Sequence, residues 1–245
     1  MTYPINYPTP QDCDVQFFYG LPVKETGGIN QIFGWVKPKG ASFVWFTLIG
    51  GGGPGGNSGD FSGGGGGSGA VTNCLMPAFL VPDELRVSLG GSGNKNNDTR
   101  ILYQGPQASA GYVLLRASGS NGGSEATGGP GGVSVAKSAF AAAGFYQSTT
   151  GASGSNGVNI PASTTTFLSG GTSESATVTP NYGYPTSSTA SPSGFFQMST
   201  IIVGRGGQSN VLGEATPGGL GCGGGGPVTG FGGAGGAGMV VIISW

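Results

Sequence analysis

Histidine is absent from the 245-residue sequence, and cysteine is scarce. Without an imidazole, Ser-His-Asp and Cys-His catalytic sites are impossible, as are zinc sites that contain histidine. Three widely separated thiols, Cys13, Cys74 and Cys222, cannot supply the four ligands of an all-thiolate site. Their odd number argues against a disulfide framework and favours buried, inert thiols. We therefore expect no catalytic, metal-binding or cofactor-binding residues, and we predict that the protein is not an enzyme.

Charged residues and long hydrophobic runs are also missing. Charged side chains make up 8% of the chain and the formal net charge is -1, so there is no basic field to attract nucleic acid or anionic lipid. The longest apolar run, residues 43–49, is far shorter than the roughly 20 residues of a membrane-spanning helix. Residues 1–15 lack the basic and apolar regions of a signal peptide. These features predict neither nucleic-acid binding, nor membrane insertion, nor a secretion signal.

Glycine, in contrast, is abundant, with 55 residues concentrated in four segments. A glycine in a regular element costs roughly 0.5–1 kcal/mol relative to alanine, so this composition needs a structure that uses the missing side chain. A bundle of polyproline-II-like strands does so, because its backbones approach closely and bond through main-chain groups. No Gly-X-Y register holds, which excludes collagen, and the bounding strands are too apolar for a flexible linker. The segments predicted to form this bundle are 50–69, 118–132, 204–213 and 218–238.

Short β-strands are predicted between the glycine-rich segments. Residues 41–49 are apolar on both faces, as in a fully buried strand. Residues 84–89 alternate, with Leu85, Val87 and Leu89 inward and Arg86 and Ser88 outward. Residues 135–144 are the one candidate for a short helix, because an alanine run ends at a glycine. The predicted class is all-β, with at most one short helix. The other predicted strands are 99–104, 112–117, 133–136, 200–203 and 239–245.

Two segments differ in composition from the glycine-rich domain predicted over 41–245. Residues 1–40 are dense in proline and aromatics, which predicts an extended arm that packs either on its own domain or on a partner. Residues 147–199 form a Ser/Thr-rich insertion with one charge and scattered aromatic side chains. Small polar residues with rigid aromatics are typical of an adaptable contact surface, although a solvated loop has the same composition.

The order of these features resembles the glycine-rich domain of tailed-phage virion proteins. WVKPKGASFVWFTLIGGGGPGG (35–56) is similar to the opening of that domain, where a Pro/Gly turn leads into a hydrophobic strand and a poly-Gly run. ELRVSLGGSGN…TRILYQG…YVLLRASGSNGG (84–123) is similar to its middle section, and GGGGPVTGFGGAGGAGMVVIISW (223–245) to its last glycine run and strand. In character the chain is related to the distal adhesins of T-even-type tail fibres. The resemblance implies a short-strand β-sandwich merged with a polyglycine-II-like bundle, and variable loops at the tip.

The resemblance also implies a function on the virion surface. A tail-fibre or tail-tip component, made in the host cytoplasm, would bind a host-surface glycan or outer-membrane protein through the 147–199 loop. The candidate receptor-binding residues are Tyr182, Tyr184, Phe195 and Phe196, because aromatic rings stack on sugar faces without charge. Residues 1–40 would dock on other virion proteins, and a homo-oligomer is expected, with a trimer as one possibility. A structural decoration, head fibre or fibre collar is the alternative, and an ice-binding protein is a remote one.

Overall fold

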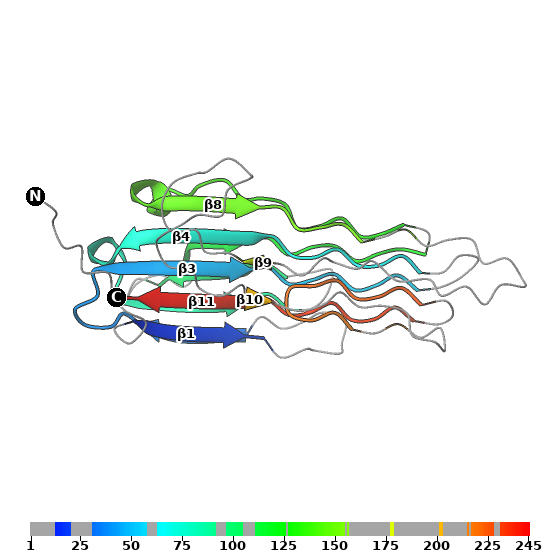
Figure 1. The fold of residues 1–245 in the computed structure, drawn as a ribbon, viewed down its shortest axis with the longest axis horizontal. Coiled ribbons are helices and arrows are strands. Elements are labelled where there is room, and N and C mark those ends of the chain that lie inside the picture. Colours follow the sequence, from blue (N-terminus) through cyan, green and yellow to red (C-terminus); the bar gives the residue numbers. More distant parts are fainter. Residues whose placement is uncertain are drawn as a thin grey trace, which may run out of the picture.

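The structure is a computed structural model of the 245-residue chain. The residues that it describes are 13–20, 31–57, 63–91, 97–104, 111–125, 127–154, 156, 177–178, 201–202, 215, 217–227 and 231–245. Two antiparallel sheets lie at one end, and extended glycine-rich segments run out from them to the other end (Figure 1). The all-β class and the sandwich are therefore confirmed.

The larger sheet has five strands in the order β1-β11-β3-β4-β8. The central strand β3 pairs with β11, near the end of the chain, on one side and with β4 on the other. The first strand, β1, completes one edge beside β11, so segments far apart in sequence lie side by side. The strands span Asp14–Tyr19 (β1), Phe43–Ile49 (β3), Val71–Pro77 (β4), Phe145–Thr149 (β8) and Met239–Ser244 (β11).

The smaller sheet has four strands in the order β2-β5-β6-β7, with a register shift between Ile101 and Leu102. Its strands span Gln31–Val36 (β2), Glu84–Leu89 (β5), Thr99–Tyr103 (β6) and Tyr112–Ala117 (β7). Two 3-10 turns, Ala78–Leu80 (η1) and Phe140–Ala143 (η2), lie in connections. A separate pair joins Thr177–Val178 (β9) to Ile201–Ile202 (β10).

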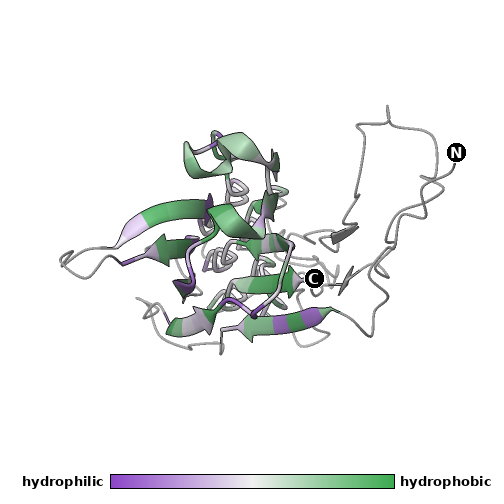
Figure 2. Ribbon diagram, turned by 90° about the vertical axis from the view of Figure 1, so that its left-hand side faces the viewer, coloured by the Kyte–Doolittle hydropathy of each residue, from purple (hydrophilic) through white to green (hydrophobic). Residues whose placement is uncertain are grey.

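The main hydrophobic core lies between the two sheets. The view along the long axis from the sandwich end shows strands that are mostly hydrophobic (Figure 2). Alternate residues of β3, such as Phe46, point into this core, where the ring of Phe46 meets that of Trp35 edge to face at 6.1 Å. The intervening residues of β3, Trp45 and Ile49, belong to a second buried cluster with Val241. Both faces of β3 are therefore buried beyond Phe43, as the apolar run predicted.

The glycine-rich segments form a bundle in which hydrogen bonds repeat every three residues. Along segment 63–70, one set of N–H groups donates to carbonyls of segment 217–227: Gly63, Gly66 and Gly69. A second set donates to carbonyls of segment 118–125: Gly64, Gly67 and Ala70. The N–H of Ser68 donates to a third neighbour, Ala152. Three residues per turn is the repeat of a polyproline-II-like helix, so one strand bonds to several neighbours around it.

Main chains in this bundle lie too close for side chains. A Cβ atom added at Gly52 or Gly235 would lie well inside 3.0 Å of backbone atoms, a separation that real Cβ atoms essentially never show. A left-handed backbone does not explain why these positions are glycine. Among the described glycines, positive φ angles occur at Gly40 (85°) and Gly221 (70°), and not at Gly52 or Gly235. Proline is tolerated in the bundle at positions that need no N–H donor, because it has none. Pro54 is an example, since its carbonyl accepts from the N–H of Gly123.

Parts of the predicted 1–40 arm and of the predicted 147–199 loop belong to the sheets and the bundle. Within the predicted 1–40 arm, β1 and β2 are edge strands of the two sheets, whereas residues 1–12 and 21–30 lie outside the described residues. At the start of the predicted 147–199 loop, β8 pairs with β4, and the N–H of Gly151 donates to the carbonyl of Gly132 in the bundle. The predicted bundle segment 204–213 also lies outside the described residues.

Three sequence-based predictions need correction. Residues 135–144 form only the single 3-10 turn η2. Residues 133–136 are not a strand, because side chains provide their partners: Val135 donates its N–H to Ser148 Oγ and accepts from the Tyr146 hydroxyl. Ser88 was expected to face outward, but it is 4% exposed.

The close approach of main chains predicts a large penalty for Gly235→Val. The added side chain would separate strands 231–238 and 50–57, so we expect a loss of about 3 kcal/mol or more, or roughly 6–12 °C in melting temperature. Gly34→Val is the matched control, because Gly34 is exposed in β2 and no atom lies within 4 Å of its Cβ position. The control should change stability by less than about 1 kcal/mol. Equal melting temperatures for the two variants would contradict the close packing.

Candidate functional site

The first part of the site is the junction that fixes the bundle to the smaller sheet. Asn97, which precedes β6, is buried, and its carbonyl accepts from the N–H of Gly51 while its side-chain amide donates to the carbonyl of Ser120. Thr99 Oγ1 accepts from the N–H of Gly90 at 3.1 Å. This short segment thus bonds three glycine-rich strands where they leave the sheets.

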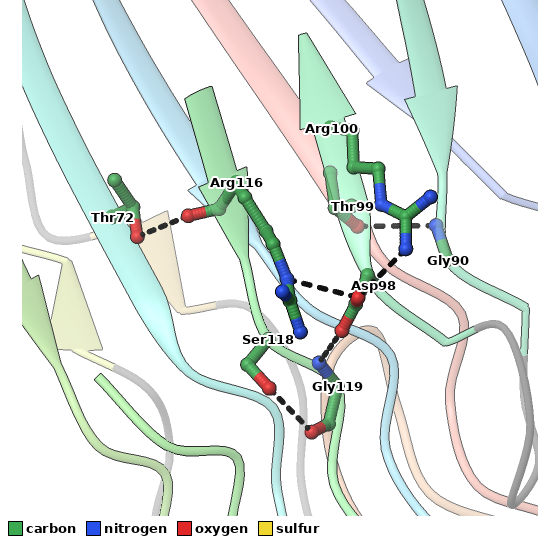
Figure 3. Close-up of polar contacts among 8 residues, drawn as sticks. All are labelled: Thr72, Gly90, Asp98, Thr99, Arg100, Arg116, Ser118 and Gly119. Carbon is green, nitrogen blue, oxygen red and sulfur yellow. Dashed lines mark hydrogen bonds and ion pairs between the residues drawn. The ribbon is translucent and has the colours of Figure 1, made fainter. Parts of the chain in front are cut away.

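Asp98 carries the charge of this junction (Figure 3). One carboxylate oxygen accepts from Arg100 and from Arg116, both at 2.9 Å, and the other accepts from the N–H of Gly119 at 3.0 Å. The Asp98 side chain is only 14% exposed, so these bonds are poorly screened. Two strands, β6 and β7, are thereby tied to the first residues of segment 118–125.

The protonation of Asp98 is coupled to this geometry. Partial burial acts to raise the pKa of Asp98, but the hydrogen bonds from Arg100 and Gly119 and the charges of both arginines outweigh it. The pKa therefore lies below the ordinary value of 3.8. Because the folded state favours the carboxylate, Asp98 stabilises the protein above this ordinary pKa. The stabilisation is lost as the pH falls through the folded-state pKa.

The residues of the junction, Asn97-Asp98-Thr99, also match the sequence pattern of an N-glycosylation site. The side chain of Asn97 is buried and bonded in the folded protein, and the residue is 8% exposed. An acceptor for an N-linked glycan lies on the surface. In the folded protein this sequon is therefore a structural feature and not an accessible modification site.

The second part of the site is the tip, which we define as the described residues at the far end of the bundle. Segment 118–125 turns back into 127–132 here, and the turn is closed by a 2.6 Å contact between the hydroxyls of Ser124 and Thr127. Figure 1 shows this end opposite the sandwich and the C-terminus. The turn is tight because the N–H of Ser124 also donates to the carbonyl of Thr127.

Two asparagine side chains cap main-chain groups at the tip. Asn57 Oδ1 accepts from the N–H of Gly232 at 3.1 Å, and Asn156 Oδ1 accepts from the N–H of Gly128 at 2.9 Å. Beside the first cap, Phe231 is 85% exposed. The tip thus presents a polar surface with one rigid aromatic ring, which suits stacking against a sugar or an apolar side chain. Sequence reasoning missed Phe231, although a lone aromatic residue between glycines was the available signal.

The predicted receptor-binding residues lie outside the described residues: Tyr182, Tyr184, Phe195 and Phe196. The structure does describe where the chain enters their segment. The N–H of Gly154 donates to the carbonyl of Gly129, and Asn156 caps Gly128, so residue 156 lies at the tip. The chain therefore enters residues 157–176 from the far end of the bundle.

Elsewhere in the described ranges, the chemistry is sparse. A hollow of about 340 Å³ on the smaller sheet is lined by residues that include Gly34, Glu84, Arg86 and Gln104. No group of three or more Cys, Asp or Glu side chains among the described residues could hold a metal ion. The structure also describes no helix long and apolar enough to cross a membrane.

Two of the three cysteines, Cys74 and Cys222, are buried, as the interpretation of inert thiols requires. Cys74 and Cys222 are 0% exposed, and no disulfide joins the three cysteines. Burial raises the pKa of the Cys74 thiol to about 12, against a smaller lowering by the charge of Lys137. Because the thiolate is the reactive form, Cys74 is unreactive at neutral pH.

Asp98→Asn should reveal the junction as a pH-dependent loss of stability. At neutral pH the variant loses charge-assisted bonds to both arginines, and we expect a cost of about 1–3 kcal/mol. The difference from the native chain should shrink below the ordinary aspartate pKa and vanish below the folded-state pKa, because the native carboxyl is then also neutral. Denaturant unfolding at a series of pH values measures this difference.

Asp83→Asn is the control, since Asp83 pairs with Lys37 from an 86% exposed position and should contribute little to stability. A constant difference across the pH range would contradict the assignment.

Comparison with known proteins gives one family. Residues 28–245, which include every strand from β2 to β11, match the glycine-rich domain family. No curated protein matches the chain. The match covers most of the sequence and both parts of the architecture, the sandwich and the bundle. The chain therefore belongs to the family of glycine-rich domains.

Proposed function

We propose that the protein is a non-enzymatic component of the surface of a tailed-phage virion, in a tail fibre or tail tip, and that it binds the host surface. The observation that carries the proposal is the position of residue 156 at the tip, where the Ser/Thr-rich segment continues into residues 157–176. The resemblance to tailed-phage virion proteins supplies the biological setting. In this proposal the sandwich and bundle are a scaffold, and residues of the segment make the contact.

A scaffold of this kind suits recognition by loops. A main-chain-bonded bundle holds the ends of its connections in fixed positions, which lowers the entropy lost when a loop binds its ligand. Asn57 caps segment 231–238 there and Asn156 caps segment 127–132, so the described tip is ordered by its own hydrogen bonds. The low charge of the chain, 8%, favours contacts by aromatic rings and small polar groups over ion pairs.

Within this proposal, Tyr182, Tyr184, Phe195 and Phe196 contact a glycan or an outer-membrane protein, and Phe231 adds a ring from the described tip. The N-terminal 40 residues connect the protein to other virion components. A purely structural role as a decoration or collar is the alternative. It keeps the same scaffold but assigns no ligand to the tip.

Adsorption to cells tests the proposal. Labelled, purified protein is mixed with a panel of bacterial strains, and the bound fraction is measured after centrifugation. We expect adsorption to a subset of strains and its loss, at least about tenfold, on deletion of 180–197 or on changing the four aromatic residues to Ser. The melting temperature of each variant shows whether the scaffold is intact.

The matched control is Phe79→Ser, because Phe79 is 83% exposed in η1, far from the tip. This variant should adsorb as the native protein does. Adsorption that survives the deletion of 180–197 and the four substitutions contradicts receptor binding by this segment, and failed virion assembly with unchanged adsorption supports the structural alternative. Thermal hysteresis in solution would instead support ice binding.

A further inference from the structure

Strand β1 presents a bare edge of the larger sheet. It lies at the border of that sheet, beside β11, and no strand among the described residues pairs with its other side (Figure 1). An exposed edge is a template for pairing with another chain, and proteins protect such edges with lysine, proline or a bulge. The strand, DVQFFY, has none of these and carries one charge, at its first residue, Asp14. Within the described part of the chain, this edge is therefore unpaired and can accept another strand.

The free backbone groups of β1 belong to three particular residues. The N–H of Gly20, directly after β1, donates to the carbonyl of Gly238, so Gly20 directs its N–H toward this neighbour as a residue of a hydrogen-bonded pair does. In an antiparallel ladder such pairs alternate, so Gln16 and Phe18 also direct their main-chain groups toward β11. The residues between them direct their N–H and C=O groups outward: Val15, Phe17 and Tyr19.

The same three residues have exposed apolar side chains. Val15 is 38% exposed, Phe17 52% and Tyr19 58%. All three lie on one face of the sheet, because they alternate with Phe18, which packs against the main core. Val15, Phe17 and Tyr19 thus each combine outward-directed backbone groups with an exposed apolar side chain.

We infer that two copies of this chain pair through β1, antiparallel, about a two-fold axis at Phe17. In this register Phe17 faces Phe17 of the second copy, and Val15 faces Tyr19, so all three outward residues enter hydrogen-bonded pairs. Directly opposite residues of an antiparallel pair share a face, so a register moved by one residue would mix the two faces of the sheet. Aromatic and β-branched cross-strand pairs stabilise such a ladder.

The charge distribution of β1 suits pairing with a second copy of the chain. In the two-fold register Asp14 faces Gly20, and the two Asp14 residues lie at opposite ends of the ladder, so they do not repel each other closely. The neighbouring edge strand β2 has no charged residue and exposes Ile32 (61%) and Val36 (65%). It lies on the same side of the sandwich as β1, since the rings of Phe18 and Phe33 lie 5.8 Å apart. Depletion of charge with enrichment of aromatic residues is typical of the core of an interface.

This inference does not rest on receptor binding, and its test needs no host cell. Sedimentation of the full chain over a range of concentrations should give a species of twice 24.0 kDa. Phe17→Lys places two ammonium groups across the axis and should weaken the dimer at least about tenfold. Tyr112→Lys is the matched control, because Tyr112 is 67% exposed on another edge strand, β7, and should leave the dimer intact.

The register is tested by cross-linking. In a Cys13→Ser background, Phe17→Cys should be joined to its counterpart by a short bismaleimide, because Cα atoms of a hydrogen-bonded pair lie about 5.5 Å apart. Phe79→Cys, also exposed, should not be joined, and Cys74 and Cys222 are buried. A native chain that is monomeric at every concentration overturns the inference. So does an oligomer that Phe17→Lys does not weaken, or equal cross-linking at positions 17 and 79.

Discussion

The structure depends on main chains that touch one another. In the bundle, a backbone carbonyl occupies the space that a Cβ atom would need, at positions such as Gly52, Gly66 and Gly235. Each strand then exchanges hydrogen bonds with several neighbours, because successive N–H groups of a three-residue helix point in different directions. Side-chain packing stabilises most folds, whereas here it is the absence of side chains that allows the backbone groups to be satisfied. Glycine content is therefore a requirement of the geometry and not a sign of flexibility.

The bundle buries few apolar side chains, so the sandwich must supply most of the hydrophobic stabilisation. The two parts share the same chains: β3, β4, β7 and β11 each continue directly into, or arise from, a bundle segment. Order in the sheets thus fixes one end of each bundle strand and reduces the entropy lost along the rest. The junction at Asn97 and Asp98 strengthens this connection, because it joins the smaller sheet to segments 50–57 and 118–125.

Much of this architecture was predictable, for reasons that differ between elements. β5 and β7 were predicted with their observed bounds, because apolar runs ended at turn residues. β4 was missed although it is an interior strand of the larger sheet, because Thr72 and Asn73 interrupt its apolar pattern. Both residues are buried, and the side chain of Asn73 accepts from that of Thr47 across the strand pair. β1 and β2 were assigned to an arm, since their proline-rich flanks hid their partners, which are β11 near the end of the sequence for β1 and β5 for β2. For the site, the junction follows only from three-dimensional contacts, and Phe231 was missed although it stands alone between glycines. The four aromatic residues of the Ser/Thr-rich segment remain a prediction.

The proposed role on a virion requires a scaffold that holds its tip in place, and this in turn requires that the bundle is ordered by its own hydrogen bonds. Hydrogen exchange of the backbone amides tests this requirement most directly, because it reports the opening of each segment separately. We predict that segments 50–57, 63–70 and 231–238 exchange as slowly as the strands β3, β4 and β11 that they respectively adjoin. Exchange in these segments as fast as in an unstructured glycine-rich peptide, with β3 and β11 still protected, would contradict the account.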